Sequence, residues 1–243
     1  MIKTVCIIQA RMGSTRLPGK VLLPILERPM LWWDVYRVQQ SRLIDDIIIA
    51  TTTQTTDDAI VDLCHQHKWQ VSRGSEDDVL DRYYQAMQAS DADYIVRITS
   101  DCPLIDPAVI DYTIATLQST APQHDYASNT FGNRTYPRGL DTEVFTRATL
   151  ERAWHEATQA HEREHVTPYI WQNPSQFKLL SVQNQQDFSS HRWTVDTPED
   201  LQLVRMIYQH FGQGDFLWQD VLKVLQDYPE WSVINQHIEQ KKL

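Results

Sequence analysis

Short β-branched and apolar runs alternate with amphipathic segments of helical length through the first half of this chain. Strands are predicted at 4–9, 46–51, 69–72 and 94–99, and helices at 30–40, 57–67, 79–89 and 108–117. Strands separated by such helices form a parallel sheet with right-handed crossovers and helices on both faces. We therefore predict an α/β fold, Rossmann-like, with three αβα layers, a mostly parallel central sheet and ligand groups at the carboxyl ends of the strands.

After Pro122 the alternation gives way to irregular and β-like segments. We expect β-structure at 126–129 and 141–145, helices at 148–157 and 164–171, and a strand at 177–182. Pro198 after Thr197, followed by two acids, predicts a helix over 198–211. The prediction is one domain over 1–211 with a smaller α+β insertion at 122–182 that shapes a second binding surface, and a helical C-terminal tail at 212–243.

Composition excludes several classes of protein. A formal net charge of -10 argues against DNA or RNA as a partner, because nucleic-acid binders display a basic excess. No run of 18 apolar residues predicts a membrane span, and the N-terminus lacks the pattern of a secretory signal, so a cytoplasmic location is expected. Cys6, Cys64 and Cys102 are widely spaced and are expected to be free thiols.

The segment QARMGSTRLPGK, residues 9–20, follows the first predicted strand directly. Its glycines allow backbone N–H groups to approach a phosphate closely, and Arg11, Arg16 and Lys20 can neutralise the charge of a triphosphate and of a leaving pyrophosphate. It is not a Walker A loop, because Pro18 stands where the second glycine is expected and Val21 follows the lysine in place of serine or threonine. A glycine-containing surface turn with solvated cations is the alternative.

Two aspartates follow later predicted strands. Asp101 lies at the end of the strand at 94–99, where its carboxylate would face the first loop and could bind Mg²⁺ together with nucleotide phosphates. An Asx-type turn before Pro103 is its alternative interpretation, and Asp106 is predicted to cap the next helix. Asp196 also follows a strand-like run, although the sequence DTPE is equally typical of a helix start.

These three segments resemble the nucleotide-sugar cytidylyltransferases, the group that contains the 3-deoxy-manno-octulosonate and acylneuraminate enzymes. The nearest likeness is to the spore coat polysaccharide biosynthesis protein F family, and it extends over RGSEDDVLDR at 73–82, RGLDTEV at 138–144 and EREHVTP at 162–168. The resemblance implies a fold of the nucleotide-diphospho-sugar transferase type and transfer of CMP from CTP to an acidic sugar or related small hydroxy compound, with release of pyrophosphate, in surface polysaccharide or glycan biosynthesis. Ser100 replaces the glycine of the octulosonate enzymes, so the resemblance does not name the acceptor.

Residue by residue, the resemblance implies four sets of site residues. The catalytic cations would be Arg11 and Lys20, and the ligands of Mg²⁺ or Mn²⁺ would be Asp101 and Asp196. The residues that bind nucleotide would be Ala10, Arg11, Gly13, Ser14, Thr15, Arg16, Lys20, Arg73 and Ser100. The residues that bind the acceptor would be Asn129, Arg138, Asp141, Glu143, Arg163 and His165.

Three alternatives stay open. The same fold also suits a nucleotide-sugar-binding or glycosyltransferase-like protein, which would release no pyrophosphate. His161 and His165 match the H-E-x-x-H pattern of zinc metalloproteases, but Pro168 follows within one turn and no third ligand is evident. The aromatic tail could join two subunits as a homodimer, which the sequence does not establish.

Overall fold

A seven-stranded sheet forms the centre of the protein in the computed structural model, which describes residues 2–240. The predicted domain and tail extend beyond this range at residue 1 and at 241–243. In spatial order the strands are β5 (Gln70–Gly74), β4 (Asp46–Thr52), β1 (Thr4–Gln9), β6 (Tyr94–Thr99), β8 (Glu143–Thr146), β7 (Tyr126–Ser128) and β9 (Leu179–Ser181). Only β8 runs antiparallel to its neighbours in this sheet. The predicted α/β fold with a mostly parallel sheet is confirmed.

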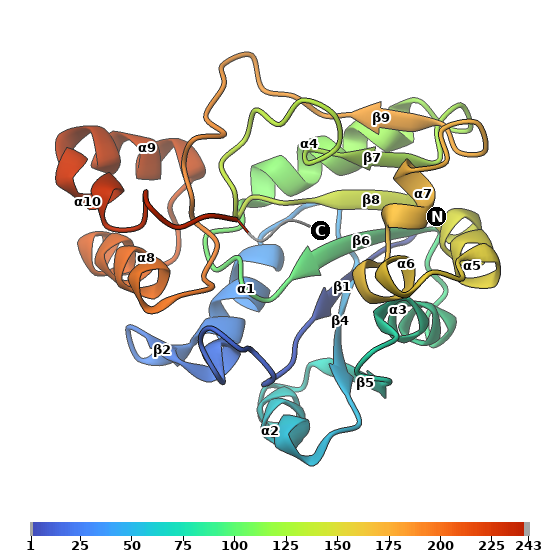
Figure 1. Cartoon of the computed structure of the whole chain (residues 1–243), viewed down its shortest axis with the longest axis horizontal. Coiled ribbons are helices and arrows are strands. Elements are labelled where there is room, and N and C mark those ends of the chain that lie inside the picture. Colours follow the sequence, from blue (N-terminus) through green and yellow to red (C-terminus); the bar gives the residue numbers. More distant parts are fainter. Residues whose placement is uncertain (1, 241–243) are drawn as a thin grey trace.

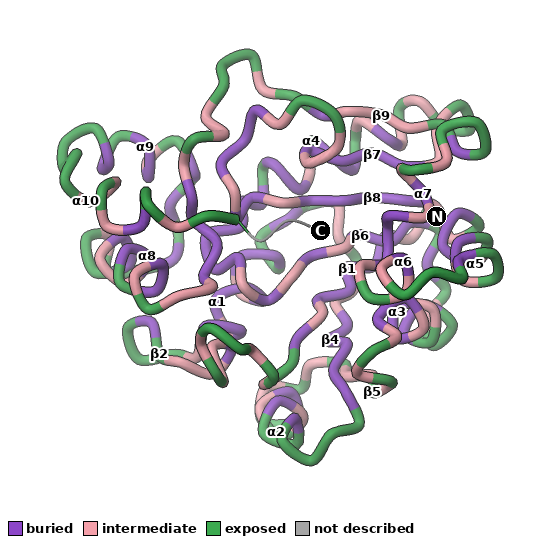
Figure 2. Tube along the Cα trace, in the orientation of Figure 1, coloured by how far each residue is buried: buried purple, intermediate pink, exposed green. Residues whose placement is uncertain are grey.

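Helices cover both faces of the sheet (Figure 1). The α-helices of the described residues are α1 (Met30–Val38), α2 (Asp58–His67), α3 (Val79–Gln88), α4 (Pro107–Ser119), α5 (Arg147–Glu156), α6 (Ala160–His165), α7 (Pro168–Trp171), α8 (Pro198–Phe211), α9 (Trp218–Asp227) and α10 (Pro229–Val233). Side chains of β1 alternate between two hydrophobic clusters: Cys6 and Ile8 pack with α1, α4 and α8, whereas Val5 and Ile7 pack with α3 and α5. The sheet is therefore buried on both sides, as Figure 2 shows for its central strands.

The order of the strands places two loops side by side. From β1 the chain builds β4 and β5 on one side and then returns to place β6 on the other side of β1. The last residues of the two strands, Gln9 and Thr99, are paired, and the Ser100 amide donates to the Gln9 carbonyl at 3.1 Å. The loops after β1 and β6 thus leave the sheet at its topological switch point, where open α/β sheets bind ligands.

The region at 122–182 extends the main sheet. Strands β7, β8 and β9 add to the β6 edge, helices α5 and α6 pack against α3, and α7 packs against α5 and α6. The single helix predicted at 164–171 is wrong, because Val166 adopts a positive φ of 73° and Pro168 begins a second helix. A hairpin of β2 (Pro24–Ile25) and β3 (Arg28–Pro29), and two 3-10 turns at Lys20–Leu22 and Thr55–Asp57, were not predicted.

The segment after α8 packs on the core through Phe216, α9 and Trp231 of α10. Helix α9 buries Trp218 and Val221 in the same cluster as α1 and α8, and the Trp218 amide donates to the Asp106 carboxylate at 2.8 Å. Asp106 also caps α4 as predicted, since it accepts from the amides of Ala108 and Val109. Among residues 2–240, no helix has the length and apolar character to cross a bilayer.

Candidate active site

The loop after β1 is closed by backbone and side-chain hydrogen bonds. The Met12 amide donates to Asp57 at 2.7 Å, and the Gly19 amide donates to the Met12 carbonyl at 3.1 Å. Gly19 has a φ of 67°, a conformation that favours glycine, and it turns the chain into the short 3-10 turn that begins at Lys20. The sequence thus folds into a fixed loop whose last residue, Lys20, is directed toward the ends of other strands.

Lys20 connects the two aspartates expected at the site. Its Nζ lies 3.2 Å from Asp101 Oδ2 and 2.9 Å from Asp196 Oδ1, and it also donates to the Val195 carbonyl at 2.8 Å. Burial alone would lower the pKa of Lys20, but the two carboxylates outweigh burial and raise it. Burial likewise opposes ionisation of Asp101, yet the charge of Lys20 holds the pKa of Asp101 below its usual value. Lys20 and Asp101 are therefore both charged at neutral pH.

A second set of contacts fixes the direction of Asp196. Its Oδ2 forms an ion pair with Arg16 and accepts a hydrogen bond from Arg192, each at 2.9 Å. Arg192 in turn binds the fully buried Asp200 through Nε and Nη2, at 2.8 and 2.9 Å. Asp200 also accepts from the amides of Asp196 and Thr197 at the start of α8. The sequence DTPE at 196–199 therefore begins α8 and also fixes the orientation of the Asp196 side chain.

The other residues expected to bind nucleotide lie around this loop. Arg11 pairs with Glu76 at 3.3 Å, and Gly13, Thr15 and Arg16 are exposed on the loop surface. Ser14 accepts from the Leu17 amide at 3.3 Å and so shapes the turn. Ala10 and Ser100 are buried at the ends of the paired strands β1 and β6.

Arg73 lies at the end of β5, on the far side of β4 from the first loop. Its guanidinium donates to the Thr52 carbonyl at 2.8 Å and the Gln54 carbonyl at 2.9 Å, and it pairs with Asp58 at 2.7 Å. In this structure Arg73 stabilises the segment after β4 through these contacts.

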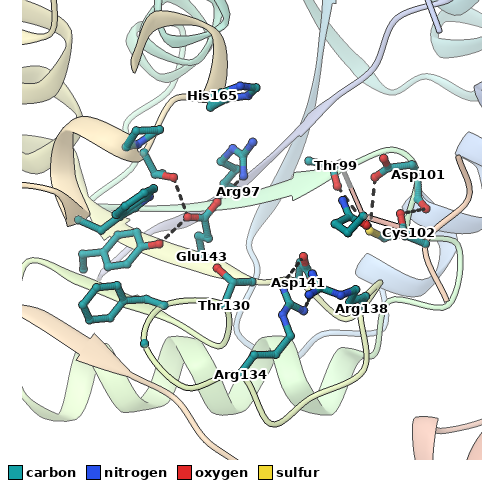
Figure 3. Close-up of a pocket in the computed structure, with 18 residues that line it drawn as sticks. Arg97, Thr99, Asp101, Cys102, Thr130, Arg134, Arg138, Asp141, Glu143 and His165 are labelled. Carbon is teal, nitrogen blue, oxygen red and sulfur yellow. Dashed lines mark hydrogen bonds and ion pairs between the residues drawn. The ribbon is translucent and has the colours of Figure 1, made fainter. Parts of the chain in front are cut away.

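A cavity of about 590 Å³ opens beside Asp101 (Figure 3). It lies between the end of β6 and the segments contributed by 130–143, 165–171 and 194. Four of the six residues expected to bind the acceptor line it, namely Arg138, Asp141, Glu143 and His165. Because Asp101 contacts Lys20 and also lines this cavity, the loop after β1 and the cavity form one continuous site.

The remaining two expected acceptor residues have other contacts. Asn129 is buried and ties two loop segments together, since its side chain donates to the Leu140 carbonyl at 2.6 Å and accepts from the Thr142 amide at 2.9 Å. Arg163 points to α3, where it binds Asp78 at 2.7 Å. Neither is among the described residues that line the cavity. In this structure both support the walls of the site.

Most cations of the cavity are paired with acids (Figure 3). Arg97 binds Glu143, which also accepts from Tyr126 and from Thr167. Arg134 makes two hydrogen bonds to Asp141, at 2.6 and 2.9 Å.

Arg138 differs from the other arginines of the cavity. Within residues 2–240 its guanidinium makes no ion pair, and burial together with nearby Arg134 lowers its pKa while leaving it positively charged. Arg138 is therefore the cation best placed to receive an anionic group.

The sequence did not single out Arg97, Arg134 or Arg192 as site residues. Arg97 lies in the predicted strand at 94–99, two residues before the strand ends, and its alternating side-chain position on β6 faces the cavity; this alternation could have revealed it. No local pattern marks Arg134 or Arg192, whose partners are defined by the fold. Asp34 of α1 was also missed: it is fully buried, and burial and the nearby charge of Asp101 raise its pKa well above the usual value.

The H-E-x-x-H segment is used for helix capping. The buried Glu162 accepts from the amides of Thr158 and Gln159 at 3.0 and 2.9 Å at the start of the six-residue helix α6. His161 contacts Gln172, whereas His165 lines the cavity. A carboxylate that caps its own helix is not free to serve as a general base, and this geometry gives the protease alternative no support.

The donor set at Asp101 and Asp196 fits a hard divalent cation. Both groups are carboxylates, and they already converge on one positive charge, that of Lys20. Within the described residues no cluster of three or more His, Cys, Asp or Glu side chains could hold a metal ion. Mg²⁺ commonly uses one or two protein carboxylates and completes its shell with phosphate oxygens and water. The site therefore suits a metal that arrives with a nucleotide.

A cationic loop that faces two carboxylates at the switch point of an open sheet defines an α/β protein of the nucleotidyltransferase class. Residues 5–223 match the family model described as cytidylyltransferase, and the chain belongs to that family.

Individual relatives agree with this assignment. The chain is 35% identical to the spore coat polysaccharide biosynthesis protein SpsF of Bacillus subtilis, over 85% of this chain and 87% of that protein. It is 33% identical to a 3-deoxy-manno-octulosonate cytidylyltransferase of Geobacter metallireducens, over 49% of this chain and 46% of that protein. The solved structure of a cytidylyltransferase from Leptospira borgpetersenii superimposes with a TM-score of 0.92 at 33% identity and covers 100% of both chains. The expected resemblance is confirmed.

Proposed function

We propose that this protein transfers CMP from CTP to an acidic sugar or a related small hydroxy compound and releases pyrophosphate, with Mg²⁺ or Mn²⁺ held by Asp101 and Asp196. The observation that carries the proposal is that Lys20 joins Asp101 to Asp196, while Asp101 and Arg138 both line the cavity. The loop of residues 10–20 would bind the triphosphate, and the cavity would bind the acceptor.

The chemistry proposed is a direct displacement. A hydroxyl oxygen of the acceptor attacks the α-phosphorus, the bond from that phosphorus to the bridging oxygen breaks, pyrophosphate leaves and the hydroxyl proton passes to water. Arg11 and Lys20 stabilise the charge that grows on the leaving group. A bound divalent cation would supply further charge neutralisation at the phosphate oxygens. Positioning and electrostatics suffice for such a reaction, so no covalent enzyme intermediate is invoked.

An anionic acceptor is favoured by the pairing of charges in the cavity. Arg97 and Arg134 are neutralised by Glu143 and Asp141, and Arg138 remains available for a carboxylate or phosphate. The relative SpsF is named for polysaccharide biosynthesis, and the Geobacter relative is named for transfer to an eight-carbon keto acid. Free, buried Cys6, Cys64 and Cys102 suit a reducing compartment such as the cytoplasm.

Labelled CTP tests the reaction against the glycosyltransferase-like alternative. With a ³²P label in the α-phosphate, the proposal predicts that label becomes attached to the acceptor, whereas a γ-phosphate label leaves as pyrophosphate. Asp101→Asn should abolish both the attachment of the α-phosphate label and the release of the γ-phosphate label, without a change in folding. Asp187→Asn, at an exposed position, serves as the matched control. Attachment of label by Asp101→Asn at the normal rate would remove Asp101 from the metal site.

A further inference from the structure

The segment after α10 returns to the site and is anchored there. Asn235 is buried, and its side-chain amide donates to the Arg192 carbonyl at 2.9 Å and to Asp200 Oδ1 at 2.8 Å. Arg192 and Asp200 are the same two residues that orient Asp196. The end of the chain is therefore fixed to the support of a candidate metal ligand, although residues 236–240 are mostly exposed (Figure 2).

Gln240 brings this segment to the wall of the acceptor cavity. Its Oε1 accepts from Arg192 Nη1 at 2.5 Å, and its side chain lines the cavity with Arg138 and Thr194. A second cavity of about 340 Å³ lies beneath the segment, and Arg138 and Gln240 line both cavities. Figure 1 shows the segment as the dark red trace that runs from α10 toward the centre of the molecule. Gln240 thus stands at the boundary between the two cavities.

The amide of Gln240 has a defined chemical role in this position. Because Arg192 binds the oxygen of the amide, the two N–H groups of Nε2 remain as donors, and they make no hydrogen bond within residues 2–240. A donor beside Arg138, which makes no ion pair within residues 2–240, suits an oxygen-rich anion. We propose that Gln240, held by Arg192 and anchored through Asn235, contacts the acceptor and determines which acceptor is used; this inference rests on the proposed function.

Three variants test this proposal with steady-state kinetics in which CTP and acceptor are varied separately. Gln240→Ala is expected to raise the KM for the acceptor about tenfold, as for loss of one hydrogen bond to a charged group, and to leave the KM for CTP within about twofold. Gln240→Glu keeps a side-chain oxygen that can accept the hydrogen bond from Arg192, but it replaces the two N–H donors by a negative charge. It should therefore raise the KM for the acceptor substrate more than Gln240→Ala does. Gln236→Ala, on the same segment but lining only the second cavity, should match the wild type.

Comparison of the acceptor KM values of Gln240→Ala and Gln240→Glu shows whether Gln240 contacts the acceptor or serves only to hold Arg192. If Gln240 served only to hold Arg192, Gln240→Glu would strengthen that contact and behave like the wild type, and this result would overturn the proposal. An unchanged acceptor KM in Gln240→Ala, with normal pyrophosphate release by the wild type, would overturn this inference alone. Binding of 3-deoxy-manno-octulosonate measured by calorimetry separates the two claims. Binding that Gln240→Ala weakens, in an enzyme that releases no pyrophosphate from CTP, would contradict the proposed reaction and support the role of Gln240.

Discussion

Lys20 and Asp196 are in direct contact, with 2.9 Å between Nζ and Oδ1, although one ends the first loop and the other precedes α8. Both side chains are largely buried, so the contact depends on accurate placement of the two segments. Asp101 joins them from the end of β6. One cation therefore brings together the three sequence segments that resemble the cytidylyltransferases.

Replacement of Lys20 should impair the reaction more than the fold. Lys20→Met is expected to lower kcat/KM for CTP by about 10² to 10³, the range found when a preorganised charge is removed from a transition state. Lys223→Met, which removes an exposed lysine on α9, is the matched control. The measurement is initial-rate kinetics with folding checked by circular dichroism, and activity within a factor of two of the control would exclude Lys20 from catalysis.

Arg138 should act on the acceptor and not on the nucleotide. Arg138→Ala is expected to raise the acceptor KM by about 10- to 100-fold, since a hydrogen bond to a charged group contributes about 1.5–3 kcal/mol. Arg138→Lys should restore part of this loss, because it keeps the charge without the two-pronged geometry. Equal changes in the KM values for CTP and acceptor would place Arg138 elsewhere in the mechanism.

Gly139 should tolerate no side chain. It has a φ of 103°, and an added Cβ would lie 2.6 Å from the backbone carbon of Trp193. Gly139→Ala should therefore lower the free energy of unfolding by about 3 kcal/mol. Gly212→Ala is a control for the backbone conformation alone: φ is 67°, no described atom lies within 4 Å, and we expect a loss of about 1 kcal/mol. Urea denaturation measures both, and equal losses would rule out the steric contact with Trp193.

The buried pair of Arg192 and Asp200 predicts a pH-dependent stability difference. Burial opposes ionisation of Asp200, but Arg192 and backbone donors lower its pKa below the unfolded value near 3.9. The stabilisation is therefore present above about pH 4 and lost as pH falls through the folded pKa. Asp200→Asn should lower the free energy of unfolding by about 3 kcal/mol at pH 7. Urea denaturation should show this difference shrinking below about pH 4, and a difference independent of pH would contradict the charge pairing.

The sequence predicted those parts of the fold that depend on local patterns. The strand at Thr4–Gln9 is a short apolar, β-branched run, and the helix at Pro198–Phe211 begins with a cap and a proline. The proximity of Asp101 to the first loop followed from one rule about the carboxyl ends of parallel strands. These features needed no knowledge of distant contacts.

Features that depend on tertiary packing were not predictable from single residues. Arg163 stands in a run that resembles a family segment, but its partner Asp78 begins a different helix. The break between α6 and α7 requires Val166 at a positive φ, which the sequence disfavours and the surrounding packing imposes. Gln240 lies in the tail, and it reaches the cavity wall through its own contact with the distant Arg192 and through the contact of Asn235 with the same residue.

Pyrophosphate release tests the central claim most directly. The wild-type enzyme would be incubated with Mg²⁺ and each of the four nucleoside triphosphates in turn, against a panel of keto-sugar acids and small phosphorylated hydroxy compounds, with EDTA as the control. We predict release with CTP and one acidic acceptor, abolished by EDTA and by Asp101→Asn. No release with any pair, together with no rise in melting temperature on addition of CTP and Mg²⁺, would contradict the assignment of the nucleotide site.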